Sequence, residues 1–87
     1  MSLRDAVNEY LEALDAEALF ADGFDDAILG VGFQQSKGPF VVYDWLKCVE
    51  VLTEGGLSWD EAVEHMDFNV TGAWVGESTP VFLHRMV

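Results

Sequence analysis

The alternation of apolar and polar residues is most informative near the middle of the chain. Residues 27–33 and 40–43 are two runs of β-branched, aromatic and small apolar residues, and a polar linker, residues 34–39, separates them. Such a pattern is typical of a β-hairpin whose loop is longer than two residues. We therefore expect strands at about residues 26–34 and 39–43, and we expect the rest of the fold to be organised around this hairpin.

The first part of the chain has helical periodicity. Ser2 lies three residues before Asp5, as in a capping box, and Asp22-Gly23 supplies a glycine that can end a helix. We expect a helix at about residues 3–20. Its apolar stripe repeats at steps of three and four residues and consists of Leu3, Val7, Tyr10, Leu11, Leu14 and Ala18.

Two further helices follow the hairpin. Asp44 is placed as an N-cap and Gly55-Gly56 as a stop, which predicts a helix at about residues 44–54, with Leu46, Val49 and Leu52 on its buried side. Ser58 and Glu61 form a second capping box, with Leu57 placed to staple onto Ala62, and the following stripe predicts a helix at about residues 58–74. That stripe consists of Trp59, Ala62, Val63, Met66, Val70, Ala73 and Trp74. A strand at residues 68–74 is the alternative, since Phe68, Val70 and Trp74 also fit a period of two.

The last element is a short strand at about residues 79–84, entered at Pro80, which favours an edge position. The order helix, strand, strand, helix, helix, strand predicts one α+β domain over residues 1–87. We expect two layers, with the helices packed on one face of a three-stranded antiparallel sheet.

Composition points to a second copy of the chain. Of 87 residues, 51% are apolar without counting the eight glycines. A domain of this size buries only about 60% of the surface that its unfolded chain exposes. A homodimer would cover the excess apolar surface, and a monomer with scattered exposed apolar residues is the alternative.

The charge distribution restricts the partners. The formal net charge is −12, with eight acids in residues 1–26, seven in residues 44–67 and only Lys37 in residues 27–43. Such a field repels nucleic-acid phosphates and anionic lipid headgroups, so we expect neither direct nucleic-acid binding nor membrane binding. A single cysteine and the absence of a secretory leader favour a reducing cytosol.

Few residues suggest catalysis. Cys48 falls on the inner side of a predicted helix, where a buried thiol is the ordinary outcome, and the histidines are His65 and His84. Glu61 and His65 lie one helical turn apart, with Glu64 and Asp67 nearby, but two ligands do not complete a metal site. The glycines follow no phosphate-binding pattern. We therefore predict no enzyme and no cofactor, and keep a small metal-binding protein or enzyme as an alternative.

Three motifs carry a resemblance to known sequences. They are Asp-Gly-x-Asp-Asp-Ala at residues 22–27, Tyr-Asp-x-x-Lys-Cys at residues 43–48, and Phe-Asn-x-x-Gly-Ala-Trp-x-Gly-Glu-x-Thr-Pro at residues 68–80. Over residues 22–83 the chain resembles a family of small bacteriophage and prophage proteins of undefined function. The resemblance implies a phage-encoded accessory protein acting in the cytosol of an infected bacterium, supplies no catalytic residues, and favours a continuous helix through Asn69.

These observations predict a protein that acts by binding another protein of the host or the phage. Acidic helix faces would steer it toward a basic surface, and tryptophans, although mostly core residues at this size, also anchor interfaces. In a sharper form, the acids imitate nucleic-acid phosphates and inhibit a host nucleic-acid-binding or defence protein. A structural homodimer without such mimicry is the alternative. The candidate surface comprises Asp5, Glu9, Glu12, Asp60, Glu61, Glu64, Trp59 and Trp74.

Overall fold

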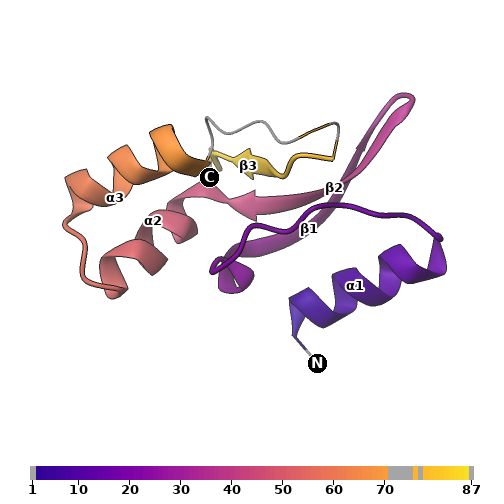
Figure 1. The fold of residues 1–87 in the computed structure, drawn as a ribbon, viewed down its shortest axis with the longest axis horizontal. Coiled ribbons are helices and arrows are strands. Elements are labelled where there is room, and N and C mark those ends of the chain that lie inside the picture. Colours follow the sequence, from indigo (N-terminus) through magenta and orange to yellow (C-terminus); the bar gives the residue numbers. More distant parts are fainter. Residues whose placement is uncertain (1, 71–75, 77, 87) are drawn as a thin grey trace.

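The computed structural model describes residues 2–70, 76 and 78–86, and it has the predicted α+β composition. Three α-helices accompany a three-stranded open sheet with the strand order β1-β2-β3 (Figure 1). A 3-10 turn, η1, precedes the first strand, and a π-helical turn, η2, continues the third helix. The elements are α1 (Leu3–Ala13), η1 (Asp25–Ala27), β1 (Ile28–Gln34), β2 (Lys37–Asp44), α2 (Trp45–Glu54), α3 (Trp59–His65), η2 (Met66–Val70) and β3 (Val81–Leu83).

The predicted hairpin is confirmed, but its loop is shorter than expected. β1 and β2 pair antiparallel, and Gln34 lies opposite Lys37, so only residues 35–36 form the turn. The polar residues after the turn belong to β2 because the register shifts beside Phe33 and leaves room there for Gly38 and Pro39. Gly38 has φ +105, and a Cβ at this position would lie 3.2 Å from the Phe33 Cα. The close approach therefore requires glycine.

The third strand is at the predicted edge, but the prediction of an antiparallel sheet is wrong. β3 pairs with β2 in parallel, with Val42 opposite Val81 and Asp44 opposite Leu83, so the sheet is mixed. The reason is the connection. A parallel pair needs a crossover connection of a dozen or more residues, and residues 45–80, which include α2 and α3, separate the end of β2 from the start of β3.

The first helix is seven residues shorter than its predicted range of residues 3–20. Asp15 has φ 52, its N–H donates to the Glu12 carbonyl at 3.0 Å, and the Ala16 N–H donates to the Leu11 carbonyl at 3.0 Å. This is a Schellman motif with aspartate in the left-handed position, and it ends α1 at Ala13. Residues 14–24 contain no helix. Their apolar side chains keep the helical spacing but pack on the core from a non-helical chain.

The other two helices begin as predicted. The Asp44 carboxylate accepts from the Lys47 N–H at 3.3 Å, and Ser58 and Glu61 form the complete capping box. The α-helix prediction over residues 58–74 is too long, since α3 ends at His65 and η2 follows. The strand alternative is wrong for residues 68–70, which lie in η2, and residues 71–74 lie outside the described residues.

One apolar core joins the sheet to the helices. The side chains of Val41 and Tyr43 point to it from β2, and Leu46, predicted to be buried, is exposed instead. α2 and α3 lie together beyond one end of the sheet, while α1 lies toward the opposite end of the long axis (Figure 1). Packing of all helices on one face is therefore not confirmed. The buried residues are Val7, Leu11, Phe24, Ala27, Ile28, Val41, Tyr43, Cys48, Val49, Ala62 and Met66.

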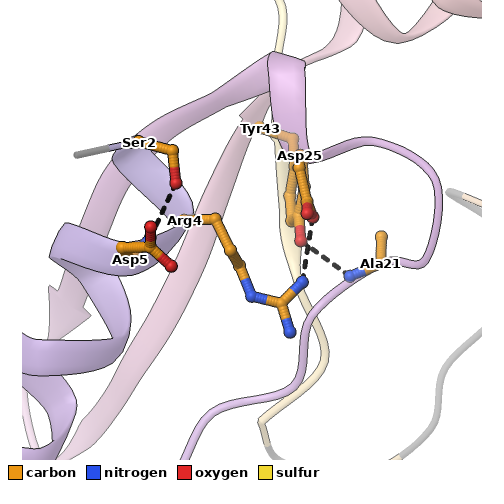
Figure 2. A network of polar contacts seen from close by, with 6 residues as sticks. All are labelled: Ser2, Arg4, Asp5, Ala21, Asp25 and Tyr43. Carbon is orange, nitrogen blue, oxygen red and sulfur yellow. Dashed lines mark hydrogen bonds and ion pairs between the residues drawn. The ribbon is translucent and has the colours of Figure 1, made fainter.

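A small polar network fixes residues 14–24 against the sheet (Figure 2). The Tyr43 hydroxyl oxygen accepts a hydrogen bond from the Ala21 N–H at 2.7 Å. The Arg4 guanidinium pairs with Asp25 at 2.9 Å and lies 3.8 Å from the centre of the Phe20 ring. These contacts link α1 to η1 and to residues 14–24.

Candidate functional site

The acidic side chains predicted on α3 all face solvent. Asp60, Glu61 and Glu64 are exposed, and so is half of the Trp59 surface. The Ser58 N–H donates to the Glu61 carboxylate at 2.9 Å, and this hydrogen bond lowers the pKa of Glu61 below the ordinary carboxyl value. Glu61 is therefore ionised at neutral pH, and its side chain is held in place by the capping box.

An aromatic side chain missing from the predicted surface lies beside these acids. Phe68, on η2, is 75% exposed. Together with Glu61 and Glu64 it lines a shallow hollow of about 280 Å³. The spacing could have indicated this neighbourhood, since positions 61, 64 and 68 recur at steps of three and four and so share one side of a helix. The indication was masked because Phe68 also fits the period of two on which the strand alternative was based.

The acidic residues predicted on α1 are exposed too, but they form a separate surface. Asp5, Glu9 and Glu12 face solvent, and the Asn8 side-chain amide donates to the Glu12 carboxylate at 3.3 Å. α1 and α3 lie toward opposite ends of the molecule (Figure 1). The structure therefore does not bring the two acidic faces together. Trp74, the remaining predicted anchor, lies outside the described residues.

Trp45 and His84 contact each other, away from the acidic residues of α1 and α3. The rings of Trp45 and His84 stack with their centres 4.5 Å apart. Trp45 is half-buried at the start of α2, and His84 follows β3. This contact links the C-terminal residues to α2.

The thiol considered as a nucleophile is buried. Cys48 is fully covered by its neighbours, and burial, with a smaller effect from Asp44, raises the pKa of its thiol to about 12. A thiol with this pKa is protonated at neutral pH, and the thiolate is the reactive form. The environment of Cys48 therefore suits a structural side chain.

The residues considered for a metal site are only partly gathered. In residues 2–70, 76 and 78–86, no three histidine, cysteine, aspartate or glutamate side chains are close enough to hold an ion. The Glu61 carboxylate accepts the hydrogen bond from the Ser58 N–H, and the His65 Nδ1 lies 3.5 Å from the Asn69 side-chain nitrogen.

A second and larger hollow lies next to the exposed surface formed by Asp60, Glu61, Glu64 and Phe68, which we call the α3 face. It has a volume of about 750 Å³ and is enclosed by parts of residues 19–24, of α3 and η2, and of residues 80–82. His65 and Asn69 border both hollows. The exposed acids and Phe68 on one side, and this hollow on the other, therefore form adjoining surfaces.

Within the described part of the chain, no helix has the length and apolar character needed to span a bilayer. Comparison with protein-family models, with curated proteins and with solved structures finds no match to the chain. The resemblance to phage proteins accordingly stays a prediction that rests on the three motifs.

Proposed function

We propose that this chain is a non-enzymatic interaction protein that binds a partner with a basic surface through α3 and η2. The observation that carries the proposal is the exposure of Phe68 beside Glu61 and Glu64. A large exposed aromatic ring costs free energy in water, and aromatic residues ringed by polar groups are typical interface anchors. Carboxylates around it favour a partner rich in lysine and arginine.

The biological setting that we propose is the cytosol of a bacterium carrying the corresponding phage or prophage. The three sequence motifs support this setting, and the net charge of −12 supports a partner that normally binds nucleic acid. Inhibition of a host nucleic-acid-binding or defence protein is the sharper form of the proposal.

The test is capture of partners from a bacterial lysate on immobilised chain, comparing Phe68→Ala and Glu64→Gln with Glu9→Gln on α1. A basic protein should be retained at low salt by the unchanged chain and by Glu9→Gln, released at high salt, and lost with Phe68→Ala. Glu64→Gln should weaken retention. Capture that is equal for all four proteins would contradict a role for the α3 face.

The outer face of the sheet supports a second candidate, a structural homodimer. Val81 and Leu83 point away from the core on the same face as Val42, and they are 42% and 44% exposed. Asp44 and Arg85 pair at 3.7 Å, so their charges offset each other beside that face. A second copy could cover it without bringing the acidic helices together.

Light scattering at tens of micromolar chain tests this candidate. Leu83→Lys should convert a dimer into a monomer, whereas Leu46→Lys, equally exposed but on α2, should leave it intact. A monomer for the unchanged chain would exclude the candidate.

A further inference from the structure

The 750 Å³ hollow beside the α3 face has apolar walls. Phe20 and Phe24, from residues 14–24, and Phe82, from β3, line it together with Val70. Its volume is in the range of sites that hold small ligands or single large side chains. Aromatic rings pair favourably with other aromatic rings in offset or edge-on arrangements. The walls therefore suit a flat aromatic group better than an aliphatic one.

The polar groups at this hollow favour a cation. Asp22 is exposed at its border, and no lysine or arginine is among the described residues that line it. Arg4, whose guanidinium lies over the Phe20 ring, is paired with Asp25. The chain as a whole carries a net charge of −12. A positively charged group next to the aromatic ring would gain from Asp22, whereas an anionic group would be repelled.

The position of the hollow connects it to the α3 face. His65 and Asn69 border both the hollow and the acidic surface around Phe68. Asp22 lines the hollow and Glu64 lines the α3 face, so a segment lying across His65 and Asn69 runs from one carboxylate toward the other. A tryptophan flanked by lysines satisfies all three requirements, an aromatic ring and a cation on each side.

We propose that the hollow receives an aromatic side chain of the partner, presented by a segment with basic residues beside it. The proposal rests on the proposed function, because it assigns the partner's anchor to a pocket that adjoins the α3 face. It adds a second point of recognition, which is apolar and distinct from the carboxylates.

Three blocked peptides separate the contributions: acetyl-Lys-Trp-Lys-amide, acetyl-Lys-Ala-Lys-amide and acetyl-Ala-Trp-Ala-amide. Each is titrated into the isotopically labelled chain, and amide shifts are followed by NMR. The first peptide should bind about tenfold more tightly than the second, as burial of a large apolar side chain predicts. Acetyl-Ala-Trp-Ala-amide should shift the amides of Phe20, Phe24 and Val70, and leave those of Asp60 and Glu61 unchanged.

Two variants with matched controls locate the contact. Leu19→Ala removes an exposed side chain that lines the hollow but not the α3 face. It should lower the affinity for both tryptophan peptides about threefold. Leu29→Ala, similarly exposed on β1, should have no effect. Asp22→Asn should reduce the preference for the lysine-flanked tryptophan, and Asp26→Asn, on η1, should not.

The outcomes distinguish this inference from the proposed function. If tryptophan adds no affinity, or shifts only amides remote from the hollow, the inference is wrong, while binding of the lysine-alanine peptide at Glu61 and Glu64 would still support the α3 face. If the lysine-alanine peptide does not bind and acetyl-Ala-Trp-Ala-amide shifts the predicted amides, the pocket stands and the electrostatic proposal falls.

Discussion

The two acidic helices differ in what surrounds their carboxylates. On α1, Asp5, Glu9 and Glu12 are exposed, and Glu12 is engaged by Asn8. On α3, Glu61 and Glu64 border an exposed phenylalanine and adjoin an apolar hollow. Carboxylates steer a basic partner, and a large exposed aromatic ring beside them can anchor it. Phe68 next to α3 is 75% exposed, whereas Tyr10 on α1 is 47% exposed. The comparison therefore supports α3 over α1 as the helix that we propose for binding.

The largest expected effect is a loss of stability on removing the side chain that packs η2, which follows α3, into the core. Met66, the first residue of η2, is fully buried, so Met66→Ala should lower the free energy of unfolding by about 2–5 kcal/mol. Urea denaturation followed by circular dichroism measures the loss. Met86→Ala, at a position 86% exposed, is the control and should change stability little. If both variants lose similarly little unfolding free energy, α3 and η2 are only loosely packed on the core.

The next effect concerns the attachment of residues 14–24. Tyr43→Phe removes the acceptor for the Ala21 N–H and should cost about 1–3 kcal/mol, the range for leaving a partly buried donor unsatisfied. Tyr10→Phe, on the exposed side of α1, is the control. Chemical denaturation compares the two, and amide hydrogen exchange at Ala21 should rise only in Tyr43→Phe. Unchanged exchange at Ala21 would mean that the bond contributes little.

A smaller effect compares the two N-caps. Each serine hydroxyl accepts one hydrogen bond, Ser58 from the Glu61 N–H and Ser2 from the Asp5 N–H. Only at Ser58 does a side chain also bond back to the cap, and loss of the Ser58 hydroxyl loosens that reciprocal bond from the Ser58 N–H to Glu61. Ser58→Ala should cost about 1 kcal/mol and Ser2→Ala about half as much. Thermal denaturation of both variants measures the difference. An equal or larger loss for Ser2→Ala would reverse the order of importance assigned to the two helix starts.

The smallest effect is a dependence on pH. The hydrogen bonds from Ser58 lower the pKa of Glu61 in the folded state, so the unfolded state binds the proton more tightly. This stabilisation is present above the ordinary carboxyl pKa and is lost as the pH falls through the folded value. The melting temperatures of the unchanged chain and Glu61→Ala should therefore differ at pH 7 and converge as the pH falls through the lowered pKa of Glu61. Glu61→Gln, which keeps a neutral acceptor, is the control. A difference that persists in acid would contradict the assignment.

Local signals in the sequence predicted local structure well. The hairpin, the Asp44 cap and the Ser58 capping box each depend on residues close together in the chain, and all are confirmed. The end of α1 was missed because an aspartate in the left-handed conformation has no strong sequence signature, while the apolar spacing continued. The direction of β3 was missed because it depends on the long connection between β2 and β3, whose path no single segment encodes.

The candidate site was predictable only in its charge. Exposure of the acids follows from their type, and all six predicted carboxylates face solvent. The exposure of Phe68 and the adjoining hollow depend on the packing of residues 19–24, η2 and Phe82, which are far apart in the sequence. Tertiary contacts of this kind decide which aromatic residues remain outside the core.

The parallel pairing of β3 with β2 has a consequence for the order of folding. The hairpin strands are joined by two residues, so their contacts can form early and at little cost in loop entropy. β3 meets β2 only after the chain has closed a loop that contains both later helices. Such long-range pairing is slow, so the last strand joins the sheet after the hairpin and the helical pair have formed. During synthesis, the sheet is completed only after β3 has left the ribosome.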